Sequence, residues 1–500
     1  GVTGVVGHHV DARDAPNSTH TITRQDIRLS GITDISQLLR RVAGVDVMTH
    51  YPGHTDVGIR GLNRRPANKV LLFVDGRTVR LDFLASPYVQ MLPFAVEDVE
   101  RIEVIRGPAA AVYGADAFSG IVNIILRTPG EGESYLTGAG GNRRTGRAAT
   151  SVSHRAGPFS FRASAGYSRT DMFVNLVGAD RADYGVSEIY DRPNQALENA
   201  WFSGETRLNL GEGYVVRAGS SVTVGDGAIQ GISRLRQTAV RDLFFSQTHA
   251  SLTTPFGLQL KSYWNHFEVD VDTFERPPGA LDTTGQVDQD VIDTELSFNR
   301  QFHLGVDHNF AVGVGHRYKD VKWNWLDDDH TEHHYFAYLQ DAVQLHERLR
   351  LTASFRIDRH PLLDGIQFSP RGSLVWRVVD GHALRLTGGT AFRSPSFVES
   401  YLDFENRTPI RAVTAIGQGN QNLDPERIVS IELGYANQAT DYFALETNVY
   451  YNLVFDEIQL SSVDTFRLGD FGTGEGGYDE GAQAFPVGNL QFNNEDATFY

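Results

Sequence analysis

The stretch VERIEVIRGPAAAVYGADAFSGIVNIIL, residues 99–126, decides the fold of the N-terminal part of this chain. Apolar and β-branched residues fill both of its ends, and a Gly-Pro pair and an alanine-rich run lie between them. This pattern predicts a strand over Val99–Ile105, a turn at Arg106–Pro108, one helical turn over Ala109–Tyr113 and a strand over Ile121–Leu126. Pro108 suits the first helical position, and Gly114 suits the left-handed conformation that ends a helix.

The same stretch resembles the plug domain of TonB-dependent outer-membrane receptors, in which an ERIEVIRGP…YG…G…NI run precedes the barrel. The alternative is an ordinary strand-turn-helix of a soluble α/β domain. The resemblance assigns the plug motif and the plug–barrel contacts to Arg60, Gly61, Asp75, Gly76, Arg101, Glu103, Arg106, Gly107, Pro108, Tyr113, Gly114, Gly120 and Asn123.

Residues before this stretch predict a compact α+β unit. A helix is expected over Arg24–Ser30, between a Thr23 cap and Gly31, and a second helix over Ile35–Val42, after the cap Asp34. Two further segments are plug-like, VGIRG at 57–61 and VLLFVDG at 70–76.

The composition excludes several classes of protein. The 500 residues carry a net charge of −17, which argues against a nucleic-acid partner, because binding one requires a positive surface. The chain has no cysteine, so disulfides and thiolate metal sites are excluded. No run approaches the roughly 18 apolar residues of a spanning helix, so insertion into a membrane would have to use β-strands.

Residues 349–358 have the pattern of a strand with one apolar and one polar face. Leu349, Leu351, Ala353, Phe355 and Ile357 alternate with Arg350, Thr352, Ser354, Arg356 and Asp358. The pattern recurs at 159–168 and 443–452. An apolar face toward lipid and a polar face toward a wet lumen suit a membrane barrel, although strands of soluble sandwiches alternate too.

The spacing of the turns favours the barrel. Short turns are expected at 156–158, 211–213, 255–257, 305–307, 346–348, 380–382 and 437–441. Between them lie two strands and a longer connection, such as 179–198, 276–290 or 393–426. Short turns that alternate with long loops are typical of outer-membrane barrels, and the count from Ser134 gives about sixteen strands.

The sequence therefore predicts a membrane all-β fold, an antiparallel transmembrane β-barrel with an N-terminal α+β plug domain inside its lumen. Residues 1–10 are expected to be a TonB-box-like or linker segment, 11–130 the plug and 131–500 the barrel. Two later segments also resemble the family, FRSPSF at 392–397 and NLDPE at 422–426. Because the family closes its barrel with about 22 strands, the chain is expected to be incomplete at its C-terminal end.

A plugged lumen blocks free diffusion, and the outer membrane has no nucleotide supply, so opening the lumen requires imported work. In the family this work comes from TonB with ExbB and ExbD, and TonB pairs as a strand with an extended segment near the receptor's N-terminus. The resemblance places this contact at Val2, Thr3, Val5 and Val6. Gly4 is a poor strand residue, and the alternative is that these residues are linker.

The plug has to stay folded against a polar wall. Arg60, Arg101 and Arg106 are candidates to pair with acids that face the lumen, because a guanidinium group can bind a carboxylate in bidentate geometry. The alternative is that these arginines are solvated or pair within the plug.

A ligand is expected where the tips of the plug meet the long loops. By resemblance, these tips precede VGIRG and follow VLLFVDG, and aromatic and His side chains there could hold a bulky metal chelate. The candidate ligand-binding residues are His50, Tyr51, His54, Asp82, Phe83 and Tyr88. The alternative is that they are ordinary loop surface.

The run DDDHTEHH at 327–334 is the one metal-like cluster of the sequence. Consecutive ligands rarely converge without a fixed turn, so a solvated acidic loop outside the membrane is favoured and no metal site is predicted. No segment resembles a phosphate loop, a GxSxG elbow or an HExxH helix, so no catalytic residue, cofactor or enzymatic activity is predicted.

Three functions follow. The first is energised import of a ferric siderophore, cobalamin or similar chelate by a monomeric receptor, surrounded by lipid in the outer membrane of a Gram-negative bacterium. The second is a plugged barrel that serves mainly as a surface attachment or sensing receptor. The third is a soluble all-β binding protein with an α/β cap, which would need polar residues on both faces of its outer strands.

Overall fold

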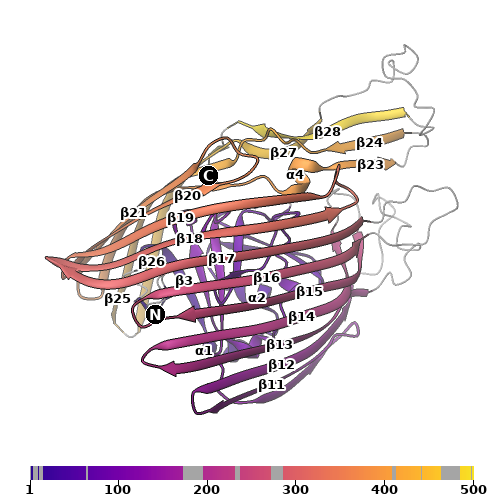
Figure 1. Ribbon diagram of the computed structural model, residues 1–500. Helices are drawn as coiled ribbons and strands as arrows, with labels where there is room; N and C mark the ends of the chain where they lie inside the picture. The colour runs from indigo at the N-terminus through magenta and orange to yellow at the C-terminus, as the bar shows by residue number, and fades with distance from the viewer. Residues whose placement is uncertain are drawn as a thin grey trace.

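The computed structural model describes residues 2–3, 9–10, 15–63, 66–172, 195–230, 237–271, 285–407, 413–440, 442–462, 485–496 and 498–499. These residues form a small N-terminal domain, the plug, and a large curved sheet, here called the barrel wall, that wraps around it (Figure 1). In the described part of the chain, no helix has the length and apolar content needed to cross a membrane.

A mixed sheet in the order β3-β8-β9-β6-β7 forms the centre of the plug. Only β6 and β9 run parallel to each other in it. The strands are β3 Ser18–Thr23, β6 Val70–Val74, β7 Arg77–Thr78, β8 Val99–Arg106 and β9 Gly120–Leu126. Around this sheet lie a hairpin of β4 Val45–Tyr51 and β5 His54–Ile59, and the helices α1 Arg24–Ser30, α2 Ile35–Leu39, η1 Val89–Met91, η2 Val96–Asp98 and α3 Ala110–Tyr113.

The strands and the helix predicted within residues 99–126 are present as β8, α3 and β9. Two details differ. The helix begins at Ala110 after the cap Ala109, so Pro108 precedes it instead of occupying its first position. Gly114 has φ +101 and ψ 172, a positive φ that is not left-handed helical. The chain turns away there because Asp116 is held by the wall, where its N–H donates to the Phe392 carbonyl at 3.0 Å.

The helices before the sheet begin at the expected caps. The Thr23 hydroxyl accepts from the Asp26 N–H, the Asp26 carboxylate accepts from the Thr23 N–H, and Gly31 ends α1 with φ +66. Asp34 caps α2, which ends at Leu39 and is therefore shorter than the expected 35–42. Residues 41 and 42 follow as tighter turns, with N–H bonds to the carbonyls three residues earlier.

The barrel wall contains 16 strands among the described residues, each antiparallel to its neighbour, in agreement with the expected number. They are β10 Tyr135–Gly140, β11 Gly146–Ala156, β12 Phe159–Asp171, β13 Gln195–Gly211, β14 Tyr214–Gln230, β15 Gln237–Thr253, β16 Leu258–Val271, β17 Gly285–Leu304, β18 Val306–Trp323, β19 His330–His346, β20 Leu349–Arg359, β21 Gln367–Val379, β22 His382–Arg393, β25 Glu426–Thr440, β26 Phe443–Phe455 and β29 Thr498–Phe499. The plug sheet ends at Leu126 and the wall begins at Tyr135, on either side of the predicted boundary at residue 130.

The two ends of the wall differ in their connections. Short turns lie at 157–158, 212–213, 254–257, 305, 347–348 and 380–381, at the expected positions. The turn expected at 437–441 is displaced, because β25 continues to Thr440. Longer connections join the strands at the other end, here called the long-loop end, which lies on the right in Figure 1. The predicted loops 179–198 and 276–290 fall mostly outside the described residues.

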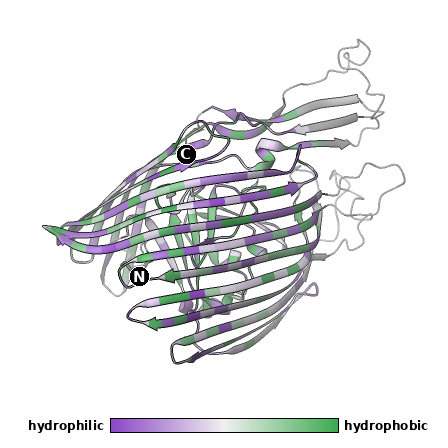
Figure 2. Ribbon diagram, viewed as in Figure 1, coloured by the Kyte–Doolittle hydropathy of each residue, from purple (hydrophilic) through white to green (hydrophobic). Residues whose placement is uncertain are grey.

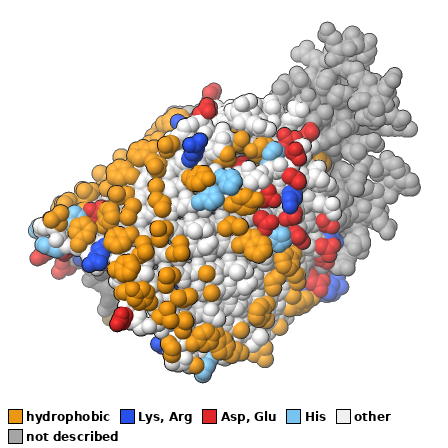
Figure 3. All heavy atoms as spheres, viewed as in Figure 1, with side chains coloured by type: hydrophobic (Ala, Val, Ile, Leu, Met, Phe, Trp, Pro, Cys, Tyr) orange, Lys and Arg blue, Asp and Glu red, His pale blue; other side chains and the backbone are white. Residues whose placement is uncertain are grey.

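Alternation along the wall places apolar side chains outside and polar side chains inside. On β20, Phe355 and Ile357 are 44% and 43% exposed, whereas Arg356 and Asp358 are 6% and 8% exposed. Hydropathy alternates along the strands in Figure 2, and hydrophobic side chains cover much of the outer face in Figure 3. A sheet with an apolar exterior and a polar interior suits a lipid environment.

A second sheet extends from the wall at the long-loop end (Figure 1). Its strands, in spatial order, are β23 Asp403–Arg407, β24 Val413–Gln418, β28 Phe485–Glu495 and β27 Glu457–Ser462. The helix α4, Phe397–Tyr401, precedes β23 and begins with a capping box of Ser396 and Glu399. The connection 393–426, expected to be irregular, therefore contains a helix and two strands. The remaining strands, β1 Val2–Thr3 and β2 His9–Val10, pair with each other near the N-terminus.

Candidate functional site

Two plug arginines bind acids of the barrel wall. Arg60, just after β5, pairs with Glu432 of β25, and both side chains are buried. Arg106, at the end of β8, pairs with Glu446 of β26, with 3.1 Å between Nη2 and Oε1. Arg385 of β22 donates to the other oxygen of Glu432 at 2.9 Å. Both plug arginines therefore face acids that point into the lumen.

Two glycines of the plug motif make room for arginine side chains. A Cβ atom at Gly107 would lie 2.8 Å from Nη1 of Arg60, and one at Gly114 would lie 3.2 Å from Nη2 of Arg356 in β20. The Pro108 carbonyl accepts a hydrogen bond from Arg371 of β21 at 2.5 Å. The motif thus brings the plug backbone against cationic side chains of the wall.

Other motif residues act within the plug. Arg101 pairs with Glu103 of its own strand at 2.8 Å, which is the alternative that the sequence left open. Asn123 of β9 donates to Glu103 at 3.3 Å. Asp75 accepts from the Leu126 N–H at 2.9 Å and joins the β6–β7 turn to the end of β9.

The backbone of three motif glycines explains their residue type. Gly61 and Gly76 lie in turns and have φ of +76 and +74. A Cβ atom at Gly120 would lie 2.4 Å from the Ile105 carbonyl of the neighbouring strand. Tyr113, the last residue of α3, packs its ring 5.9 Å from that of Phe73.

A buried ion-pair network ties the plug to the wall near the long-loop end. Arg80 binds Asp82 at 2.9 Å and Asp116 at 2.7 Å, and Lys319 of β18 binds Asp82 at 2.9 Å. The Ser394 N–H, just after β22, donates to Asp116 at 2.8 Å. Burial by itself raises the pKa of Asp116, but Arg80 and Lys319 outweigh it and hold this pKa at about 2.

Asp82 and Phe83, expected to contact a ligand, are packed into this junction. Asp82 is held between Arg80 and Lys319, and these two cations lower its pKa despite burial. Phe83 is 5% exposed, and its ring centroid lies 5.9 Å from that of Phe267 and 5.1 Å from that of Trp323. The structure gives both residues a role in attaching the plug, and their contact with a ligand stays a prediction.

The other ligand candidates meet at the β4–β5 hairpin. Nε2 of His50 lies 2.8 Å and Nε2 of His54 lies 3.4 Å from the carboxylate of Asp56. The His54 ring packs edge-on to Tyr88, whose hydroxyl donates to the Gly53 carbonyl at 2.9 Å. Burial of Asp56 raises its pKa, and hydrogen bonds from both histidines reverse this and lower it.

The tip of this hairpin rests on the wall at the long-loop end. Tyr51 packs against Met172, Ala196 and Ala228, which lie at the long-loop ends of β12, β13 and β14. A Cβ atom at Gly53 would lie 2.3 Å from the Ala196 carbonyl, so only glycine permits this approach. His50 and His54 keep 22% and 16% of their side-chain surface exposed.

A second buried network was missed by the sequence analysis. Lys69 of the plug pairs with Glu457 and lies 3.5 Å from Glu426 at the start of β25. Glu426 also binds Arg393 at 2.7 Å, and Arg393 binds Glu399 of α4 at 2.8 Å. The available signal was the family-like FRSPSF and NLDPE segments, which contain Arg393 and Glu426.

The expectation of a solvated acidic loop at 327–334 is wrong for residues 330–334. β19 begins at His330, so alternation along the strand turns Glu332 and His334 toward the lumen. Glu332 is 3% exposed and lies beside His360, which follows β20. The expectation failed because the spacing of Glu332 and His334 matches a strand, and His360 approaches them only through the pairing of β19 with β20.

The predicted contact with TonB falls on a short strand. Val2 and Thr3 form β1 and pair with Val10 and His9. Val5 and Val6 lie outside the described residues.

Comparison with known proteins decides the family. A family model described as "TonB dependent receptor-like, beta-barrel" matches residues 183–498, and a second, "TonB-dependent Receptor Plug Domain", matches residues 11–121. This chain belongs to the TonB-dependent receptors. They are outer-membrane receptors of Gram-negative bacteria and not enzymes, so the expectation of a non-enzymatic receptor is confirmed.

Relatives of this receptor agree with the assignment. The chain is 25% identical over 461 residues to the vitamin B12 transporter BtuB of Vibrio vulnificus, covering 86% of this chain and 65% of that protein's length. Among solved structures, the siderophore receptor PirA from Pseudomonas aeruginosa matches with a TM-score of 0.71 and 22% identity, over 97% of this chain and 80% of that one. PirA from Acinetobacter baumannii matches with a TM-score of 0.74 and 18% identity, over 96% and 76%.

Proposed function

We propose that this receptor binds a scarce, bulky solute at its long-loop end and imports it across the outer membrane with energy from TonB, ExbB and ExbD. The observation that carries the proposal is the plug, which occupies the space inside the barrel wall and is joined to it by buried ion pairs such as Arg60–Glu432 and Lys69–Glu457. A lumen occupied in this way needs mechanical work to open, and a pore for free diffusion would not contain such a domain.

The hairpin and the names of the relatives support a proposal for the solute class. His50, Tyr51 and His54 sit at the tip of the plug beside the long loops, where imidazole and phenol groups can hydrogen-bond and stack on a metal chelate. Tyr88 supports this tip through the hydrogen bond from its hydroxyl to the Gly53 carbonyl. Because relatives are named for vitamin B12 and siderophores, we propose cobalamin or a ferric siderophore as the solute.

The coupling to TonB is proposed at the N-terminal segment. Pro16 and Asn17 accept hydrogen bonds from Thr387 and Arg385 of β22, so the plug chain starts near the short-turn end of the wall. This end would face the periplasm, where TonB could add a strand to residues 2–6. The receptor is proposed to work as a monomer.

Uptake in cells tests the import function. Cells that express the receptor should accumulate radiolabelled cobalamin or one of a panel of ferric siderophores, and this accumulation should vanish when TonB is deleted. Thr3→Pro should abolish uptake but keep surface binding, because proline cannot extend a strand pair. Uptake that persists without TonB would refute the proposal, and binding without any uptake would favour the attachment or sensing receptor.

Substitution of the tyrosines tests the site. Tyr51→Ala and Tyr88→Ala should each weaken solute binding at least about tenfold, because each removes an aromatic surface or its support. Leu345→Ala, at an exposed position of the short-turn end, serves as the matched control. Unchanged affinity in both tyrosine variants would remove the hairpin from the site.

A further inference from the structure

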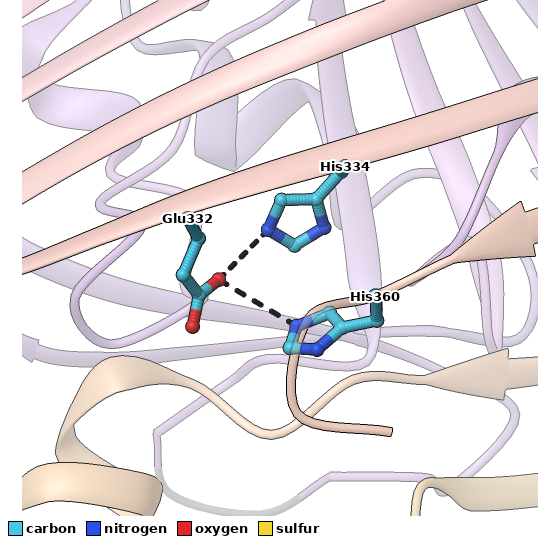
Figure 4. Close-up of side chains that lie close together, drawn as sticks. All are labelled: Glu332, His334 and His360. Carbon is cyan, nitrogen blue, oxygen red and sulfur yellow. Dashed lines mark hydrogen bonds and ion pairs between the residues drawn. The ribbon is translucent and has the colours of Figure 1, made fainter. Parts of the chain in front are cut away.

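Three metal-ligand side chains meet inside the barrel wall near the long-loop end (Figure 4). Glu332 and His334 lie two residues apart on β19, so both point inward, and His360 directly follows β20. Their ligand atoms all lie within 4.8 Å of one another. Oε2 of Glu332 is 2.7 Å from Nε2 of His334 and 3.6 Å from Nε2 of His360.

Glu332 is a buried carboxylate for which the described part of the chain supplies no lysine or arginine as an ion-pair partner. It is 3% exposed, and among the described residues its ion-pair contacts within 4.0 Å are to the two histidines. Lys319, its register partner on β18, binds Asp82 at 2.9 Å. Arg317, the register partner of His334, binds Asp293 at 2.6 Å. A buried charge requires compensation, and neutral imidazoles do not supply a positive charge.

His360 offers a buried nitrogen that the described residues leave unsatisfied. Its side chain is 2% exposed, and Nδ1 accepts from the Leu362 N–H at 3.2 Å. Nε2 makes no hydrogen bond within the described part of the chain and is directed toward Glu332 (Figure 4). Unsatisfied buried polar atoms are rare because they cost free energy, so this nitrogen calls for a partner.

We propose that Glu332, His334 and His360 bind one divalent transition-metal ion, for which zinc is the best fit. Two imidazoles and one carboxylate are donors that zinc prefers, whereas calcium and magnesium prefer oxygen ligands throughout. Zinc bonds of about 2.0–2.2 Å in tetrahedral geometry place ligand atoms about 3.3 Å apart. The separations of 2.7 Å and 3.6 Å lie on either side of this value, so small side-chain shifts would complete the site.

Binding has a local structural consequence. Ligation through Nε2 leaves the imidazole proton of His360 on Nδ1, so the Leu362 N–H has to exchange that nitrogen for another acceptor. With zinc bound, the site therefore joins β19 to the connection 360–366, and the first residues of this connection rearrange. The inference concerns a bare ion held in the wall, so it does not depend on the proposed import function.

A second His/Asp group provides the control. His266, Asp288 and Asp290 also come together, but they are half-buried on the outer face of the wall, and His266 already contacts Asp290 at 3.0 Å and Glu268 at 3.1 Å. This group has hydrogen-bond partners and contact with solvent, and removing it should not affect the inner site.

Calorimetric titration with ZnCl₂ tests the proposal on the untagged full chain, purified in detergent and stripped with EDTA. We expect a site that binds one ion per chain and is not competed by excess MgCl₂. His360→Ala and Glu332→Gln should each weaken zinc binding about 100-fold or more. His266→Ala and His303→Ala should leave the affinity of this site unchanged.

X-ray absorption at the zinc edge provides a measurement that needs no variant to fold. The zinc-loaded wild-type receptor should show a nitrogen and oxygen shell at about 2.0–2.2 Å with imidazole scattering. An absence of zinc binding would overturn the proposal, as would an all-oxygen shell. Affinity that survives in both His360→Ala and Glu332→Gln, or that is lost in His266→Ala, would also overturn it.

Discussion

At the scale of single residues, burial decides which ion pairs hold the plug. The side chains of Arg60 and Glu432 are 3% and 7% exposed, whereas those of Arg106 and Glu446 are 11% and 36% exposed. Breaking a buried pair leaves an uncompensated charge in a poorly solvated place, but water screens a half-exposed pair. The two arginines are therefore unequal, although the sequence presents them as equivalent candidates.

We expect Arg60→Ala to lower the free energy of plug unfolding by about 3 kcal/mol and Arg106→Ala by about 1 kcal/mol or less. Urea titration of the receptor in planar bilayers measures both, because solute-permeable conductance rises as the plug loosens. Arg60→Ala combined with Glu432→Ala should lose at least as much stability as Arg60→Ala alone, since the double variant also takes the Glu432 carboxylate away from Arg385. Equal losses in the two single variants would contradict burial as the cause.

Asp116 makes the plug–wall junction sensitive to acid. Its pKa of about 2 lies below the ordinary 3.8, and a carboxyl with a depressed folded-state pKa stabilises the fold at pH values above its unfolded pKa. This stabilisation is lost as the pH falls toward the folded pKa, so thermal stability should decrease between about pH 4 and pH 2. Thermal unfolding at a series of pH values measures the slope. Asp116→Asn should flatten it, whereas Asp380→Asn, at an exposed turn, should not.

The residue scale also shows the limit of local sequence reasoning. The types of Glu332, His334 and His360 suggested a cation ligand set only in part, because His360 lies outside the 327–334 run. Their convergence depends on the antiparallel register of β19 with β20, and no local spacing encodes that register.

At the scale of elements, each wall strand has one face toward the lumen and one face toward the exterior. On β20, alternate side chains contact the lumen and the exterior, so a single period of two residues specifies both faces. The strand was predictable because this pattern is local.

Predicted helix lengths were less reliable, since α2 ends early where Leu38 and Leu39 are fully buried and the following turn tightens.

A charge on the outer face of β20 tests this division. Phe355→Lys should lower the free energy of unfolding in bilayers by about 2–4 kcal/mol, because the side chain would enter the hydrocarbon. Leu349→Lys, on the same face but at the short-turn end of the strand, should cost about 0–1 kcal/mol. Unfolding by denaturant in lipid vesicles compares the two variants. Similar costs at the two positions would argue that the outer face does not meet lipid.

At the scale of the whole molecule, the plug and the wall are joined at two levels. Arg60 and Arg106 anchor the plug to β25 and β26, while Asp82 and Lys69 bind Lys319 and Glu426 of the wall nearer the long-loop end. In the proposed import, these contacts have to open before a solute crosses the lumen. In the proposed coupling, work applied at the N-terminus would reach the β3–β8 pair before the rest of the plug sheet, since β3 is the first strand of that sheet in the sequence.

A tether between plug and wall should block transport but not binding. The Ser18 hydroxyl donates to Glu446 at 3.1 Å, and the chain has no native cysteine to interfere. In the double variant Ser18→Cys/Glu446→Cys, a short thiol cross-linker should abolish solute uptake and leave surface binding unchanged. A cleavable linker should restore uptake on reduction, and the single-cysteine variants with the same reagent are the controls. Full uptake by the cross-linked receptor would contradict movement of the plug.

Much of this protein was determined by its sequence alone: the plug motif at 99–126, the helix caps at Thr23 and Asp34, the alternating strands and the rhythm of short turns and long loops. These features depend on neighbours in the chain, so they can be read locally. The tertiary structure alone decided that Arg60 meets Glu432, 372 residues away, and that Lys69 meets Glu457, 388 residues away. The physical reason is that such pairs depend on strand register and on how the plug sits in the wall, and both are set by the packing of the whole chain.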